Sequence, residues 1–371
     1  MLLRNHHTGP LPAGADTSVV QAFHARLEGY APSPLLELTG LASELGVGRL
    51  LVKDESARLG LPAFKILGAS WATYRLLMAR MGGERQWSSI DDLAAEVERR
   101  LGAPRLVTAT DGNHGRAVAR MARLLRLPST ILVPAGTAAA RVDAIASEGA
   151  DVRVVDGTYD DAVAAAAAMA SDRDLVVSDT SWPGYEDVPR WVVEGYSTIF
   201  AELDMQLAAL GLSGVDAAFV PVGVGSLAAA AATALGGGST VLVGVEPDGA
   251  ACVTAALDAG HVVEVPGPHR SLMAGLNCGL ASPLAMPAIT AAFAAMVTVD
   301  DDRCRRSIRA LAEHGLDVGE TGAAALAGLT AVVDEHAGEL PLAPTATVLV
   351  LVTEGVTDPV GFEAVVGRPP R

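Results

Sequence analysis

Residues 106–119 read LVTATDGNHGRAVA, and this stretch shows how the chain is built. A β-branched, apolar run leads into a short polar loop with two glycines, and an Ala-rich stretch of helical period follows. We therefore expect a strand, a loop and a helix in succession. In an open parallel sheet ligands bind at such strand-end loops, because free backbone N–H groups and the helix dipole meet there. The loop offers Thr110, Asp111 and Asn113 as candidate site residues, although Asp and Asn at a helix start also act simply as caps.

A second junction of the same kind occupies residues 219–230, FVPVGVGSLAAA. Its glycine loop, Gly223, Val224, Gly225 and Ser226, follows an apolar strand and precedes an alanine-rich helix. The backbone amides of such a loop, together with a serine hydroxyl, can wrap a phosphate group. The loop is neither a Walker A sequence, since it lacks GK[ST], nor a complete GxGxxG fingerprint. By itself it does not identify the ligand.

The same alternation of strand and helix patterns continues along the middle of the chain. Short apolar runs bounded by Gly, Pro, Asp or Ser alternate with Ala-rich helical stretches, which is typical of βα units over a parallel sheet. The expected strands are 49–53, 105–110, 129–133, 151–155, 175–178, 217–222, 240–245 and 346–353. The expected helices are 65–81, 89–101, 115–125, 138–147, 159–170, 189–210, 226–235, 301–314 and 322–336. The pattern predicts a parallel α/β fold.

The composition excludes several classes of protein. The chain has 371 residues, 50% of them apolar and 19% charged, which is typical of a folded globular protein and not of a disordered one. This length is expected for two domains or one large α/β unit. With a net charge of -16 and no long basic cluster, no nucleic-acid partner is expected. The longest apolar run, the nine residues 162–170, is too short to span a bilayer, so no membrane association is expected.

The cysteines bear on compartment and metal binding. Cys252, Cys278 and Cys304 are an odd number without CxxC spacing, so neither a disulfide framework nor a zinc site is expected. We predict no metal ligands. The first residues also lack the continuous apolar core of a secretory signal. Together these features predict a reducing, cytoplasmic setting.

Only two of the 27 basic residues are lysines, so a reaction that needs a primary amine has two candidates. Lys53 ends an apolar strand run and is followed by Asp54 and Glu55, which suggests an ion pair with these carboxylates. Lys65 lies in GLPAFKILGAS, at a loop-to-helix junction. A lysine is most often a solvated or snorkelling residue. Apolar neighbours would disfavour the ammonium form of Lys65, however, and we interpret its amine as the candidate nucleophile.

Two further polar residues follow expected strands. Asp179 comes directly after residues 175–178, where a cap or turn role is an adequate explanation. Thr353 ends the apolar run 346–353, which would place its hydroxyl at the carboxyl edge of the sheet. Taken alone, Thr353 is an ordinary β-branched strand residue.

Together these stretches resemble the fold type II (tryptophan synthase β-like) enzymes that use pyridoxal 5′-phosphate, and more narrowly the 2,3-diaminopropionate ammonia-lyase family. The matching segments cover nearly the whole chain between residues 30 and 358. In order they are YAPSPLLELTGLASELGVGRLLVKDESARLGLPAFKILGAS, TATDGNHGRAVA, SDTSWPGYEDVPRWVVEGYSTI, VPVGVGSLAAA, GVEP, MAGLNCG, GETGAAAL and TEGVTD.

The resemblance implies a set of residues around pyridoxal phosphate. Lys65 would form the Schiff base, Asn113 would meet the 3-hydroxyl oxygen, and Thr353 would face the pyridine nitrogen. The implied cofactor-binding residues are Phe64, Lys65, Asn113, Gly223, Val224, Gly225, Ser226, Leu227 and Thr353. One departure from the family pattern is an alanine where a glycine is expected after the phosphate loop.

The resemblance also implies the reaction, a loss of the Cα proton and of a β-substituent through an aminoacrylate to pyruvate and ammonia. Dehydratases of this fold commonly carry a small neutral residue where this chain has Asp111, because a hydroxyl departs. A β-ammonium group instead needs a carboxylate nearby, since an unpaired charge removed from water is costly. Asp111 and Asp179 are therefore the expected substrate contacts, with Thr110 beside them. One of these carboxylates and Lys65, acting as bases on opposite faces of Cα, would let both enantiomers react.

Two alternatives stay open at this stage. One is a serine/threonine dehydratase or another β-eliminating or β-replacing enzyme of the same fold. The other is a catalytically idle protein that binds an amino acid. For the architecture, the resemblance implies two open, twisted, mostly parallel sheets flanked by helices. A small domain, 69–182, would be inserted between the two parts of a large one, 1–68 and 183–371, and the protein would be a homodimer.

Overall fold

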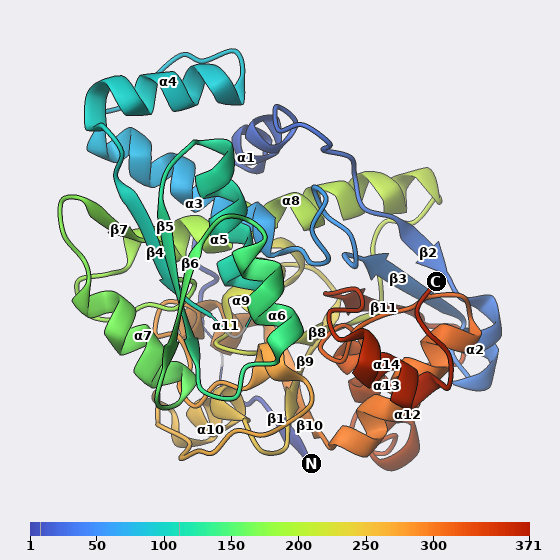
Figure 1. Cartoon of the computed structure of the whole chain (residues 1–371). Helices are drawn as coiled ribbons and strands as arrows, with labels where there is room; N and C mark the ends of the chain where they lie inside the picture. Colours follow the sequence, from blue (N-terminus) through green and yellow to red (C-terminus); the bar gives the residue numbers. More distant parts are fainter. Residues whose placement is uncertain (8, 111) are drawn as a thin grey trace.

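The computed structural model describes residues 1–7, 9–110 and 112–371 and shows two separate β-sheets flanked by helices (Figure 1). Among these residues the larger sheet has seven strands in the order β1-β10-β9-β8-β11-β3-β2. Their bounds are β1 (Leu2–Arg4), β2 (Leu35–Glu37), β3 (Arg49–Asp54), β8 (Ala217–Pro221), β9 (Val241–Pro247), β10 (Phe293–Val299) and β11 (Thr347–Val352). The edge strands β1 and β2 are antiparallel to their neighbours, and the strands between them are parallel.

The smaller sheet has four parallel strands, in the order β6-β5-β4-β7, within the described part of the chain. They are β4 (Arg105–Ala109), β5 (Ser129–Pro134), β6 (Asp151–Val155) and β7 (Asp174–Val176). All four come between β3 and β8 in the sequence, so the chain leaves the larger sheet, completes the smaller one and returns. The predicted fold class, α/β with two mostly parallel sheets, is confirmed. The domain boundaries after residues 68 and 182 stay a prediction.

Helices cover both faces of each sheet. They are α1 (Thr17–His24), α2 (Thr39–Glu44), α3 (Lys65–Arg80), α4 (Ile90–Leu101), α5 (Asn113–Leu124), α6 (Ala139–Ala146), α7 (Tyr159–Ala168), α8 (Asp187–Ala209), α9 (Ser226–Leu235), α10 (Cys252–Ala259), α11 (Met286–Ala292), α12 (Asp301–Glu313), α13 (Ala324–Glu335) and α14 (Pro359–Val366). Successive residues of β8 alternate between a core beneath α9 and a core beneath α13, as the pleat of a strand requires. In the smaller sheet α5 and α7 cover opposite faces of β4 and β5.

Helix α3 connects the two units, because it packs against α8 on one side and α5 on the other. Two glycines make the contact with α8 close. A Cβ on Gly68 would lie 2.5 Å from the ring of Tyr196, and a Cβ on Gly195 would lie 2.5 Å from the carbonyl oxygen of Leu67. Larger residues would force the helices apart, so these glycines fix where Lys65, the first residue of α3, lies.

A buried network of four charges lies beside this helix pair. Lys53 pairs with Glu202 of α8 at 2.9 Å, and Arg58 pairs with both Glu202 and Glu55, at 2.7 and 2.5 Å. All four side chains are at most 1% exposed. The predicted ion pair of Lys53 therefore exists, but its direct partner is Glu202 and not the adjacent Asp54 or Glu55. Asp54 is the next residue on β3 and points to the opposite face of the strand. The carboxylate of Glu55 is bonded to Ser33 and Arg58, whereas Glu202 faces Lys53 from the covering helix.

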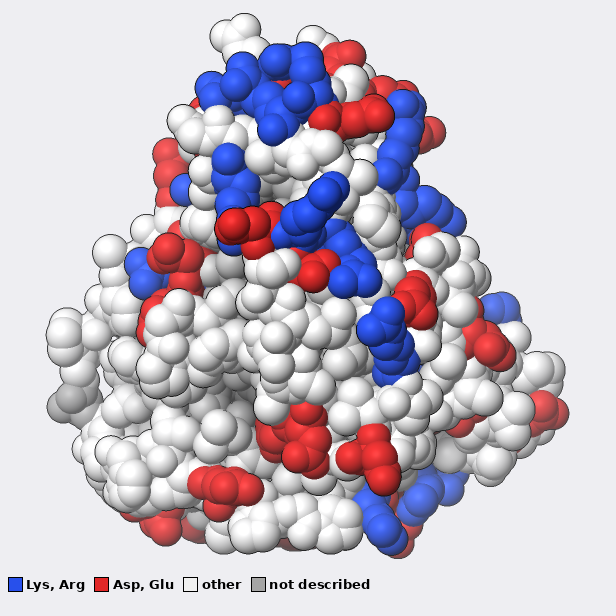
Figure 2. All heavy atoms as spheres, turned by 60° about the vertical axis from the view of Figure 1, so that its left-hand side comes forward, with Lys and Arg blue, Asp and Glu red and all other residues white. Residues whose placement is uncertain are grey.

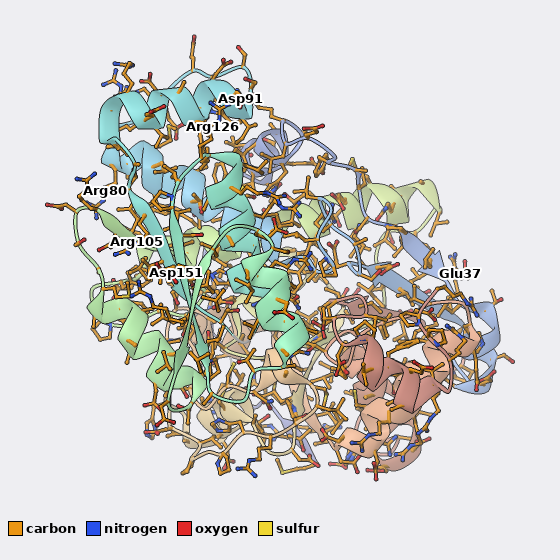
Figure 3. All side chains as sticks on the ribbon, in the orientation of Figure 1. Glu37, Arg80, Asp91, Arg105, Arg126 and Asp151 are labelled. Atoms are coloured by element: carbon orange, nitrogen blue, oxygen red, sulfur yellow. The ribbon has the colours of Figure 1, made fainter. Side chains whose placement is uncertain are left out.

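The surface carries mixed charges. On the face shown in Figure 2, basic and acidic side chains lie side by side, with basic ones most concentrated at the end of the molecule that α4 occupies. Arg126, just after α5, pairs with Asp91 of α4 at 2.5 Å, and both side chains are about two-thirds exposed (Figure 3). No helix in the described ranges is both long enough and apolar enough to cross a membrane.

Candidate active site

A pocket that is partly open to solvent lies where loops from the carboxyl ends of both sheets meet. It collects the predicted residues from distant parts of the sequence. Those that line it are Phe64, Lys65, Thr110, Asn113, Asp179, Gly223, Val224, Gly225, Ser226, Leu227 and Thr353. Asp111 lies outside the described residues.

Lys65 and Asp179 form an ion pair inside this pocket. The Lys65 ammonium donates to Oδ2 of Asp179 at 2.6 Å, and the two side chains are 22% and 5% exposed. Asp179 follows β7 in an irregular segment and caps no helix, so the cap explanation does not apply. Burial alone would raise the pKa of Asp179, but the ammonium group of Lys65 favours the charged form more strongly and holds the pKa well below its usual value. The carboxylate is therefore ionised at neutral pH.

Two side chains support Asp179 from either side. Tyr159 donates from its hydroxyl to Oδ1 of Asp179 at 3.3 Å. His114 is buried and donates from Nε2 to the carbonyl oxygen of Val177 at 2.8 Å, so Nδ1 is the unprotonated nitrogen, 3.9 Å from Oδ2 of Asp179. Burial lowers the pKa of His114 and keeps it neutral. The bonds from Lys65 and Tyr159 orient the carboxylate, and the sequence analysis did not identify Tyr159.

The glycine loop between β8 and α9 has the geometry of an anion site. The amide N–H groups of residues 223–228 bond to no acceptor among the residues that the structure describes. Gly225 has a φ of +104°, and a Cβ there would lie 2.9 Å from the Ile289 side chain. The free amides and the start of a ten-residue helix attract negative charge. Ser226 donates its hydroxyl to the carbonyl oxygen of Asp179 at 2.6 Å, so in this structure the hydroxyl ties the loop to the Asp179 segment.

The opposite wall of the pocket contains Asn113, Thr353 and an acidic residue that the sequence analysis did not select. Thr353 follows β11 and donates from Oγ1 to the carbonyl oxygen of Thr321 at 3.3 Å. Asn113, the first residue of α5, donates from Nδ2 to Oε2 of Glu354. Glu354 is 1% exposed. The sequence does contain an indication of Glu354, because this acidic residue comes directly after Thr353 at the end of a buried strand.

A second carboxyl group lies just outside this wall. Glu320 is 3.8 Å from the guanidinium of Arg141, and its other neighbours include Glu354. Burial, reinforced by the charge of Glu354, raises the pKa of Glu320 to about 7. In the described ranges there is no group of three or more His, Cys, Asp or Glu side chains that could hold a metal ion.

The residues present fit pyridoxal phosphate. A primary amine lies at one end of the pocket, six free amides on a loop without acidic side chains lie at another, and hydroxyl and amide side chains lie on the far wall. These are the groups that a phosphorylated aldehyde with a polar ring requires. The pocket therefore suits this cofactor on its own geometry.

Comparison with known proteins agrees with this geometry. Residues 26–354 match the family model for pyridoxal-phosphate-dependent enzymes. Diaminopropionate ammonia-lyase of Escherichia coli is 34% identical over 98% of this chain and 94% of its own length. Its counterpart in Salmonella typhimurium is 34% identical over 94% and 91%. A biosynthetic threonine dehydratase of Solanum lycopersicum is 28% identical over 81% of this chain and 45% of its own length.

Solved structures support the same family assignment. The crystal structure of Escherichia coli diaminopropionate ammonia-lyase in complex with D-serine superposes with a TM-score of 0.90 at 32% identity, covering 99% of this chain and 96% of that one. The same enzyme in complex with an aminoacrylate-PLP azomethine reaction intermediate superposes with a TM-score of 0.88. This chain thus belongs to the pyridoxal-phosphate-dependent enzymes of fold type II, and within them it is an ammonia-lyase-like enzyme.

Proposed function

We propose that this enzyme is a diaminopropionate ammonia-lyase, which converts D- or L-2,3-diaminopropionate, or both, to pyruvate and ammonia. The observation that carries the proposal is the buried, ionised Asp179 bonded to Lys65 inside the pocket. A substrate with two ammonium groups is the natural ligand of a pocket that keeps a carboxylate at low solvent exposure. The relatives named diaminopropionate ammonia-lyase support the same assignment.

The cofactor would be held by residues already described. Lys65 would hold it covalently through Nζ, and the amides of the 223–227 loop would bind its phosphate. Asn113 and Thr353 would contact the polar atoms of its ring, and Phe64 lines the same pocket. When bound, pyridoxal phosphate stabilises the electron pair left on Cα after proton loss.

Asp179 is the residue on which substrate choice depends. Once Lys65 is engaged by the cofactor, Oδ2 of Asp179 loses its cationic partner, and a buried carboxylate without one is costly. The β-ammonium group of the substrate supplies that partner. An ionised Asp179 held by Tyr159 can also accept the Cα proton from one face, while Lys65 serves the other. Asp111 is proposed as the second carboxylate, on the basis of the resemblance alone.

The test is the release of pyruvate and ammonia from D- and L-diaminopropionate, serine and threonine. We expect diaminopropionate to be the best substrate. Asp179→Asn should retain the cofactor but lower turnover of at least one enantiomer by about 10²-fold or more. Asp160→Asn, on α7 but outside the pocket lining, is the matched control. Faster turnover of serine or threonine would establish a dehydratase instead, and no effect of Asp179→Asn would remove its role.

The assembly and compartment remain predictions. The homodimer follows only from the family resemblance, and the cytoplasmic setting follows only from the sequence. Gel filtration with light scattering tests the first, and a dimer is the expected result.

A further inference from the structure

Glu354 is a buried carboxylate in the pocket wall to which the proposed reaction gives no task. It follows β11 and the residue Thr353, and only 1% of it is exposed. No salt bridge within 4.0 Å joins it to a cationic side chain in the part of the chain that the structure describes. Its carboxylate accepts hydrogen bonds from Nδ2 of Asn113 and from the backbone N–H of Thr321, the latter at 3.1 Å. An ionisable group kept at such burial needs a reason.

The bond to Asn113 determines which way the Asn113 amide points. Nδ2 of Asn113 is the donor to Oε2 of Glu354, so the NH₂ group of the amide faces Glu354 and the carbonyl oxygen turns away from it. The NH₂ group has two hydrogens, and Glu354 uses one of them. The other stays available to an acceptor oxygen in the pocket.

Without this carboxylate the two ends of the amide would be nearly equivalent in shape. Rotation by half a turn would then present the carbonyl oxygen to the oxygen of the cofactor ring, two acceptors facing each other. The second bond of Glu354 also matters, because the carbonyl of the same Thr321 accepts from Thr353. One carboxylate thus restrains two residues expected at the ring.

We propose that Glu354 is a positioning residue for the cofactor, because it holds the Asn113 amide with the second N–H of its NH₂ group available to the ring oxygen. The two residues lie 241 positions apart: Asn113 begins α5, which packs on the smaller sheet, and Glu354 follows β11 of the larger sheet. Their bond therefore also sets how the α5 end of the smaller unit meets the edge of the larger sheet. This inference rests on the placement of Asn113 at the cofactor proposed above.

The experiment compares Glu354→Gln, Asn113→Ala and the double variant in the full-length enzyme. Glutamine keeps the shape of the side chain. Asn113 and Thr321 bond to different oxygens of the Glu354 carboxylate, however, so the single oxygen of glutamine can replace only one of these two acceptors. Two quantities are measured: the Kd of pyridoxal phosphate after its removal and re-addition, and the pH midpoint of the visible absorption band of the bound cofactor. Glu320→Gln is the matched control, since it removes a neighbouring carboxyl group that does not contact Asn113.

We expect Glu354→Gln and Asn113→Ala each to raise the Kd roughly tenfold and to shift the pH midpoint, whereas Glu320→Gln changes neither. The Kd of the double variant should exceed that of Asn113→Ala by much less than the factor that Glu354→Gln alone produces, because the two changes share the Asn113–Glu354 bond and only the bond to Thr321 is lost in addition. Additive effects, or wild-type values for Glu354→Gln, would overturn the inference. If Asn113→Ala itself leaves both quantities unchanged, the proposed placement of Asn113 fails first. Should Glu354→Gln not fold, Glu354→Asp keeps the charge and shortens its reach, with an intermediate Kd expected.

Discussion

The two lysines of this chain occupy opposite electrostatic surroundings. Lys53 is fully buried, and its three N–H bonds go to the carbonyl of Ser33, Glu202 and Gln206, each at 2.9 Å. Lys65 is partly exposed at the pocket and bonds to Asp179. An ammonium group surrounded on all sides by acceptors has no freedom to react, whereas one that faces a cavity has room for a ligand. The open space beside Lys65, which the nitrogen of Lys53 lacks, therefore favours Lys65 over Lys53 as the proposed nucleophile.

The largest expected effect comes from Lys65→Ala. Turnover of the best substrate should fall on the order of 10³-fold or more, because no other primary amine in the sequence can reach the pocket. Pyruvate release measures the activity, and circular dichroism should show an unchanged fold. Activity within about tenfold of the wild type would contradict the assignment of Lys65.

Lys53→Met should act on stability and not directly on chemistry. Removing Lys53 leaves Glu202 with one cation fewer in a fully buried site, and we expect a loss of about 3–5 kcal/mol in the free energy of unfolding in urea. Lys53→Met combined with Glu202→Gln removes one charge of each sign, so it should cost less than the sum of the single changes. A loss below about 1 kcal/mol for Lys53→Met would show that the network is not tightly coupled.

His24 packs between α8 and α3, and it should make the free energy of unfolding depend on pH. It is fully buried, it bonds to Thr198 and to the carbonyl of Leu67 on α3, and burial lowers its pKa to about 4. The unfolded chain binds a proton near its ordinary value of 6.5, so it holds more protons than the folded chain between these two values. The stability contribution is therefore complete above the unfolded pKa and is lost as the pH falls toward 4.

The expected loss is of the order of 3 kcal/mol over that window. Urea unfolding at pH 7, 6, 5 and 4 measures it. In His24→Gln the slope over this range should be much smaller, even if the overall stability is lower. An equal slope in both proteins would assign the pH dependence to other groups.

Arg126→Ala should have the smallest effect. Its ion pair with Asp91 is exposed, and such pairs contribute about 0–1 kcal/mol and weaken with salt. We expect a change within about 0.5 kcal/mol that disappears in 1 M salt. A larger, salt-insensitive loss would show that exposure is a poor guide to the energy of ion pairs in this protein.

Much of the fold could be predicted because the inner strands carry a strong local signal. Residues 217–221, for instance, are apolar throughout and buried on both faces. The edge strands β1 and β2 were not predicted, since three half-buried residues contain too little pattern to distinguish them from a loop. Strand β10 was also missed, because its alanines follow the helical stretch of α11 without a turn residue between them.

For the candidate site, too, residues with a local sequence signal could be predicted and residues without one could not. Lys65, Asp179 and Thr353 each follow a break or a strand end, so the sequence could place them near the carboxyl edge. The contacts of Glu354 and Tyr159 could not be predicted in this way, because each joins segments from different parts of the fold, and no local pattern encodes such a pairing. Asp111 is expected in the same pocket, but it lies outside the described residues.

The scarcity of lysine has a practical consequence. Because Lys53 is inaccessible, an amine-specific reagent should modify only Lys65 and the terminal amino group of the folded chain. The label on Lys65, located by mass spectrometry, would then report on occupancy of the pocket without any substrate being turned over. Bound pyridoxal phosphate should protect Lys65 and leave the terminal amine reactive, which makes that amine an internal reference.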